Sequence, residues 1–321
     1  MKQHLHVEHT RKDYAAYDAD AVRNAVLRPL LYFDIFNYPL TIPEIVQFAP
    51  VALNGLSPVE NILDELTEAF LVFKFGEFYS LRNDPLMIER RKNGNALAAK
   101  VLQKALRRSR LIHRFPFVRS VNISGSLSKN YFDETTDFDF FIITKVNRLW
   151  LCRMVLTIYK KLFLLNSRKY FCINYYVDTT DLEIPDRNIF TAMEIITLKN
   201  QTGEKYYRKF QNANNWTKEY FPNHFQEYSG VEKENNGYLK KILEKILGAR
   251  LGDILDDFAF FLTVKFLKKR YSHMHIDELN VSMRTKKHTS KHHPQGFQFK
   301  VLKAYQEKCR DFEQQHDIIL Y

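Results

Sequence analysis

The sequence predicts an α+β protein with a small mixed sheet in the middle of the chain and helical segments on either side of it. Runs of β-branched and aromatic residues, which are typical of buried strands, occur between residues 118 and 200. Apolar residues three and four positions apart, which are typical of helices, dominate residues 21–117 and 201–321. We therefore expect a central core with a separate part before it and another after it.

Composition limits the class of protein. A chain of 321 residues exceeds one ordinary core, and a hydrophobic content of 45% is ample for burial, so two or three folded domains are expected. Charged residues interrupt the longest apolar stretches, which excludes a membrane helix. Three scattered cysteines and an amino terminus without an apolar signal favour the reducing cytoplasm. The net charge of +11 favours polyanionic partners.

The chain begins with a polar tail over residues 1–20, where the irregular histidines form no metal-binding pattern. A helix is predicted from Ala21, and another at Thr41–Glu44, where Pro43 lies in the first turn. A third begins at Ser57–Glu60, whose Ser-x-x-Glu pattern is typical of a capping box. Residues 70–81 then predict two short strands around Gly76.

Three helices followed by a hairpin make residues 21–84 similar to winged helix-turn-helix domains. In such domains the third helix contacts DNA, but here it carries only acidic charges, which would repel phosphates. These acidic residues are Glu60, Asp64, Glu65 and Glu68. We therefore expect this winged-helix-like domain to contact a protein partner or to pack on the core. Residues 85–117 predict one connecting helix with a possible bend at Gly94.

One segment carries residues suited to chemistry. The strand-like run Val121–Ile123 stops at Gly125-Ser126, a turn whose backbone can approach a phosphate closely. Asp137 and Asp139 follow at the start of an apolar strand, and their spacing of two directs both carboxylates to one face. Carboxylate oxygens suit Mg²⁺ or Mn²⁺, which bind proteins through one or two carboxylates plus substrate phosphates. Solvated carboxylates beside a strand are the simpler alternative.

A Gly-Ser turn followed by Asp-x-Asp at the head of a strand resembles the DNA polymerase beta-like nucleotidyltransferase superfamily, over residues 118–200. The resemblance implies that Gly125 and Ser126 hold a nucleoside triphosphate, with ATP expected first, and that Asp137 and Asp139 hold the metal. The neighbouring Ser128 and Lys129 are further candidates for phosphate contacts. The resemblance also implies a third carboxylate on a later strand.

That later strand is predicted at residues 170–178, after a helix over residues 149–165. Its central polar residue is Asn174, which can coordinate a cation but cannot act as a base. Asp178 would replace the carboxylate only if the strand slid or bent. Asp181 and Glu183, in the next loop, are weaker alternatives.

Residues 201–321 predict a helical domain, interrupted by a polar and basic loop at residues 284–295 that is expected to be mobile. The resemblance implies a cytoplasmic, Mg²⁺-dependent nucleotidyltransferase whose acceptor is an RNA, a protein or a small molecule. Asn174 keeps open a second hypothesis, a catalytically silent protein that senses a nucleotide in the same pocket and binds a partner.

Overall fold

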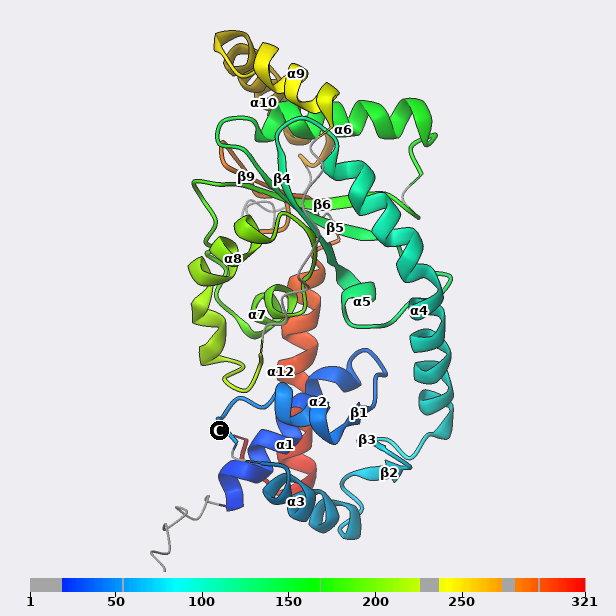
Figure 1. Cartoon of the computed structure of the whole chain (residues 1–321). Coiled ribbons are helices and arrows are strands. Elements are labelled where there is room, and N and C mark those ends of the chain that lie inside the picture. The colour runs from blue at the N-terminus through cyan, green and yellow to red at the C-terminus, as the bar shows by residue number, and fades with distance from the viewer. Residues whose placement is uncertain are drawn as a thin grey trace, which may run out of the picture.

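The computed structural model of the chain describes residues 19–53, 55–167, 169–225, 237–272, 281–293 and 295–320. The fold is α+β, with a six-stranded mixed sheet and a separate three-stranded sheet surrounded by helices (Figure 1). The predicted polar tail lies outside the described residues up to residue 18, and Ala19 already begins a helix. Within the described ranges, no helix combines the length and apolar character needed to cross a membrane.

The N-terminal part contains three helices and the three-stranded sheet. Its elements are α1 (Ala19–Asp34), β1 (Leu40–Thr41), α2 (Ile42–Gln47), α3 (Ser57–Glu68), β2 (Phe73–Phe75) and β3 (Phe78–Ser80). The central strand β3 pairs antiparallel with both β1 and β2. The apolar residues of α3 recur every three or four positions and are buried, which confirms the helical periodicity; they are Val59, Ile62, Leu63 and Leu66.

The predicted capping box at Ser57 and Glu60 is wrong. Ser57 is the first helical residue of α3, and the carbonyl of Leu56 accepts the N–H of Glu60 at 3.0 Å. The capping interaction occurs instead at α2, where the Thr41 N–H donates to a carboxylate oxygen of Glu44 at 2.9 Å.

A long helix, α4 (Pro85–His113), leads from the N-terminal part to the central sheet without interruption. Gly94 therefore marks no break in it. Its missing side chain makes room for the ring of Tyr131, since a Cβ at this position would lie 2.2 Å from a ring carbon. The Gly94 carbonyl also accepts the Phe132 N–H at 3.2 Å. In this way α4 fixes the segment that leads into the aspartate pair.

The central sheet has the strand order β7-β4-β5-β6-β9-β8. Its strands are β4 (Val118–Ser124), β5 (Asp139–Thr144), β6 (Cys172–Asp178), β7 (Lys199–Thr202), β8 (Thr285–Lys286) and β9 (Thr289–Lys291). The parallel pair β5 and β6 is joined by α6 (Leu149–Phe163), whereas the other pairs are antiparallel. The three strands predicted from apolar runs, β4, β5 and β6, are confirmed.

Two further parts of the sheet, β7 and the hairpin of β8 and β9, are formed by polar segments of the chain. β7 pairs with β4, and β9 pairs with the outer edge of β6. The expectation of a mobile basic loop at residues 284–295 is therefore wrong for Thr285–Lys291, which form a hairpin. Backbone pairing with β6 and hydrogen bonds from the Trp150 indole to the carbonyls of Lys286 and Lys287 stabilise it. The chain after residue 201 is consequently not a purely helical domain.

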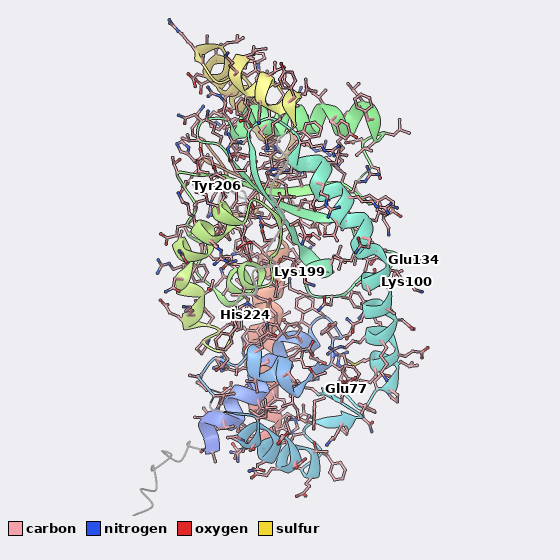
Figure 2. The ribbon with its side chains drawn as sticks, in the orientation of Figure 1. Glu77, Lys100, Glu134, Lys199, Tyr206 and His224 are labelled. Atoms are coloured by element: carbon pink, nitrogen blue, oxygen red, sulfur yellow. The ribbon has the colours of Figure 1, made fainter. Side chains whose placement is uncertain are left out.

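The remaining helices cover the sheet and connect it to the N-terminal part. They are α5 (Gly125–Ser128), α7 (Ile189–Ile196), α8 (Glu204–Ala213), the 3₁₀ helix η1 (Asn215–Glu219), α9 (Tyr238–Ile246), α10 (Arg250–Arg270) and α12 (Phe297–His316). Figure 1 shows α12 running from the sheet to α1, where the rings of Tyr305 and Tyr32 meet edge to face at 5.7 Å. A second link joins Gln47 of α2 at 2.8 Å to His224, whose position is labelled in Figure 2.

Alternate residues of the central strands enter two different cores, as the period of two requires. Phe141 and Ile143 pack toward the N-terminal part, together with α7, α8 and α12. Phe140 and Ile142 pack toward α4, α6 and α10. Because both faces are covered, polar groups are accessible mainly at the strand ends, where the candidate site lies.

Candidate functional site

The turn at the end of β4 has a backbone that requires glycine. Gly125 has a φ of 65°, in the left-handed region. A Cβ at Gly125 would also lie 2.5 Å from Oδ2 of Asp139. The turn and the first residue of β5 are therefore in direct contact, an arrangement that depends on the absence of a side chain at position 125.

The other residues of the turn mostly stabilise it from within. The buried hydroxyl of Ser128 donates to the Gly125 carbonyl at 2.7 Å, so it points into the turn rather than outward. The carbonyl of Ser126 accepts the N–H groups of Lys129 and Tyr131 at 3.0 and 3.1 Å. Ser126 itself is partly exposed at the start of α5.

Lys129 is held between the turn and helix α7. Its ammonium group lies 2.7 Å from Oε1 of Glu194 and 3.4 Å from the Gly125 carbonyl. Glu194 was not among the residues predicted for the site. The sequence could have indicated Glu194, because it is the only charged residue of the otherwise apolar α7. A lone carboxylate in an apolar helix needs a partner, and here the partner is a cation of the turn.

The buried ring of Phe138, the residue between the two aspartates, determines how the aspartate pair is oriented. Phe138 is fully buried and packs against Phe132 and Tyr170, with ring centroids 5.3 and 5.1 Å apart. Asp137 and Asp139 flank this ring and stay partly exposed, as the predicted spacing of two requires. Asp139 pairs with Ser124 in the sheet, which brings it beside the turn.

Asp139 lies in an environment that disfavours its charge. Burial, together with the negative charges of Asp137 and Glu194, raises the pKa of its carboxyl to about 7. Hydrogen bonds from Cys172 and Asn174 act in the opposite direction but do not compensate. A cation bound beside Asp139 would remove this penalty.

Asn174 lies beside the aspartate pair because β6 contains a bulge. Phe140 pairs with Ile173 and Phe141 pairs with Tyr175, which leaves Asn174 as the extra residue. Its side-chain amide donates to Oδ1 of Asp139 at 2.5 Å, and its carbonyl oxygen accepts from Cys172 at 3.0 Å. The Asn174 side chain is therefore in direct contact with Asp139.

The alternative carboxylates lie elsewhere. Asp178 is fully buried at the opposite end of β6, where it pairs with His288 at 2.7 Å and accepts two bonds from Thr180. Asp181 accepts from Thr289 at 3.3 Å, and Glu183 forms an exposed ion pair with Arg187. The possibility that Asp178 slides into the site is therefore wrong, because its contacts hold it at the far end of the strand.

The oxygen atoms at this site fit a hard divalent cation in their chemistry. Asp137 and Asp139 offer two carboxylates, and rotation of the Asn174 amide would add a carbonyl oxygen. Across the described residues there is no group of three or more His, Cys, Asp or Glu arranged to hold a metal. Two carboxylates nevertheless suffice for Mg²⁺ when phosphate oxygens complete its coordination.

A cavity of about 340 Å³ lies next to the turn, between the N-terminal part, α4 and β7. Leu127 and Asn130 line it from the turn, and Tyr38 and Arg91 line it from the opposite side. Lys199, at the start of β7, donates to the Asn130 side chain and lies near the middle of the molecule (Figure 2). The cavity therefore offers aromatic, amide and charged groups beside the turn, and its Arg91 is paired with Glu44 at 2.8 Å.

Comparisons of the chain with protein-family profiles, with curated proteins and with solved structures gave no significant match.

Proposed function

We propose that the chain is a Mg²⁺-dependent nucleotidyltransferase that moves a nucleoside monophosphate from a triphosphate to an acceptor hydroxyl. ATP is the triphosphate we expect first, and Mn²⁺ would serve in place of Mg²⁺. An RNA end, a protein side chain or a small molecule would each supply a suitable hydroxyl.

The observation that carries this proposal is the contact between Gly125 and Asp139. It brings the Gly125-Ser126 turn to within a side chain's width of the Asp139 carboxylate. A nucleotidyltransferase needs this proximity, since the metal must contact both the carboxylates and the phosphates. Neither a strand-to-helix corner nor a solvated Asp-x-Asp sequence requires it.

The residues would then have distinct roles. Asp137 and Asp139 would hold the cation, whose charge neutralises the phosphate oxygens as the bond to pyrophosphate breaks. Backbone N–H groups of Gly125 and Ser126 would orient the triphosphate. Lys129, now paired with Glu194, is close enough to the turn to exchange that carboxylate for a phosphate oxygen.

Calorimetric titration with ATP in Mg²⁺ tests the proposal. We expect Asp139→Asn to weaken Mg²⁺-dependent ATP binding by at least tenfold, about 1.4 kcal/mol, without unfolding the protein. Asp181→Asn is the matched control, because it removes an exposed carboxylate outside the site. Equal ATP affinity in wild type and Asp139→Asn would refute the assignment.

A second candidate function is a catalytically silent nucleotide sensor, and Asn174 favours it. The amide that faces Asp139 cannot accept a proton from an acceptor hydroxyl. ATP labelled at the α-phosphate separates the two functions, in Mg²⁺ and in Mn²⁺. Release of pyrophosphate with transfer of the label indicates the enzyme, whereas tight binding without turnover indicates the sensor.

The N-terminal part supports the winged-helix-like assignment through its element order and its β1-β3-β2 sheet. The acidic residues of α3 lie on its exposed side, which favours a protein partner over nucleic acid. A cytoplasmic location also belongs to the proposal, and the free state of Cys152, Cys172 and Cys309 agrees with a reducing compartment.

A further inference from the structure

Helices α9 and α10 form the end of the molecule most distant from the N-terminal part (Figure 1). They expose an unusual number of large apolar side chains, mostly by more than half of their surface. These are Tyr238, Leu239, Ile242, Ile246, Leu251, Ile254, Phe258, Phe261, Leu262 and Phe266. Exposed apolar surface of this extent marks an interaction site.

In α9 two charged residues face the protein and the apolar residues face outward, which is the reverse of the usual amphipathic arrangement. Lys240 is buried and donates to the carbonyls of His113 and Val118 at 2.7 and 2.8 Å. Glu244 also faces the protein and binds the guanidinium of Arg119 at 2.9 and 3.0 Å. Lys240 and Glu244 are therefore used inside the chain, while Leu239 and its apolar neighbours face outward beside the exposed Lys241 and Lys245.

Helix α10 has one face docked and a second face exposed. The docked face includes Asp256, which accepts the Leu151 N–H at 2.8 Å, and Phe260, whose ring lies 5.0 Å from that of Trp150. The exposed face has Leu251, Ile254, Phe258 and Phe261, spaced alternately by three, four and three residues. This is the spacing of a helix seam that packs against another helix.

The exposed area is sufficient for a stable interface. At about half exposure and roughly 200 Å² per side chain, the ten exposed apolar residues of α9 and α10 together present on the order of 1,000 Å². A standard protein interface covers about 800 Å² on each partner.

Charge along α10 indicates what the partner is. Asp253 and Asp257 lie in the first half of the helix and stay more than half exposed beside Arg148 and Lys287. The second half carries only cations, Lys265, Lys268, Lys269 and Arg270. An antiparallel pair of α10 helices centred on Phe261 sets Asp257 opposite Lys265 and Asp253 opposite Lys269. A parallel pair would set cation against cation, which is unfavourable.

We propose that two copies of this chain associate through the exposed faces of α9 and α10, with the α10 helices antiparallel about a two-fold axis near Phe261. The same patch then serves on both subunits, as a two-fold interface requires. The acidic residues in the first half of α10 disfavour an anionic lipid surface, which its basic second half alone would attract.

Analytical ultracentrifugation of the full chain at micromolar concentrations tests this assembly. We expect wild type to sediment with twice the mass of the 38.2 kDa chain. Phe258→Glu should weaken self-association at least a hundredfold, while Leu86→Glu, at another exposed apolar position, should not change it. Circular dichroism and thermal melting would verify that both variants are folded.

Charge reversal tests the antiparallel arrangement. Asp257→Lys and Lys265→Asp should each weaken the dimer, and the double variant should restore it, because the reversed charges again face each other across the axis. A wild-type monomer at every concentration overturns the proposal, and co-flotation of that monomer with phosphatidylserine–phosphatidylcholine vesicles would assign the face to lipid. Dimers insensitive to Phe258→Glu would also overturn it.

Discussion

Gly125 is the residue on which the candidate site depends most. Its left-handed backbone turns the chain out of β4, and its lack of a side chain admits the Asp139 carboxylate. Asp139 in turn is held from the other side by Asn174. These contacts leave a carboxyl of raised pKa between the Gly125 turn and the Asn174 side chain, which is a chemically demanding arrangement for a purely structural corner.

We expect Gly125→Ala to lower both stability and nucleotide affinity. The left-handed conformation costs alanine about 1–2 kcal/mol, and the new methyl group must also displace Asp139. Gly76→Ala is a matched control, since Gly76 has a φ of 62° with no atom within 4 Å of its Cβ position. Denaturant unfolding and ATP calorimetry would measure both effects. If the two variants behave alike, the contact with Asp139 has no special role.

A second residue-scale prediction concerns the missing carboxylate. Asn174→Asp would set a carboxylate against Asp139, so we expect the metal-free protein to lose about 1–3 kcal/mol of stability. Added Mg²⁺ should then raise the melting temperature more than it does in wild type, because the cation joins like charges. Asn174→Ala supplies the comparison without the charge. If added Mg²⁺ leaves the melting temperature of Asn174→Asp unchanged, that result would argue against a cation site.

At the scale of elements, the hairpin β8–β9 completes the sheet and connects it to α12. Lys291 of β9 is buried and donates to Gln298 of α12 at 2.8 Å. Between these two elements lies His293, whose backbone N–H donates to Ser282 at 2.8 Å. Burial, together with the charge of Lys291, lowers the pKa of His293 to about 4.

This low pKa predicts acid sensitivity at the junction. His293 has a pKa near 6.5 when unfolded and about 4 when folded, so the unfolded state binds more protons between these values. The contribution of His293 to the free energy of unfolding should therefore be fully present above about pH 6.5. It should be lost as the pH falls toward about 4. His293→Gln should reduce that dependence in melting curves measured across this range. If the melting temperatures of wild type and His293→Gln fall equally with pH across this range, the prediction is contradicted.

Most of the elements that sequence alone predicted have a strong apolar period. The helices α3, α4 and α6 and the strands β4 to β6 follow from such patterns. The strands β7, β8 and β9 are polar, and they form because distant edges offer backbone partners. The bulge at Asn174 and the pairing of Glu194 with Lys129 depend on tertiary contacts too, so the motif predicted the aspartates and the turn but not their surroundings.

At the scale of the whole molecule, α4 and α12 hold the N-terminal part close to the site. Asp34 of α1 is buried, and it binds Arg82 at 2.9 Å and Lys308 of α12. Tyr38 and Arg91 thereby face the cavity beside the turn. A nucleotide bound at the turn would thus contact both the central sheet and the N-terminal part.

A crystal structure with Mn²⁺ and a non-hydrolysable ATP analogue tests the central claim most directly, because the anomalous signal of manganese locates the metal. We predict a manganese peak about 2.1 Å from carboxylate oxygens of both Asp137 and Asp139, with the triphosphate against the N–H groups of Gly125 and Ser126. A manganese peak or a triphosphate elsewhere, with these two carboxylates uncoordinated, would contradict the nucleotidyltransferase assignment.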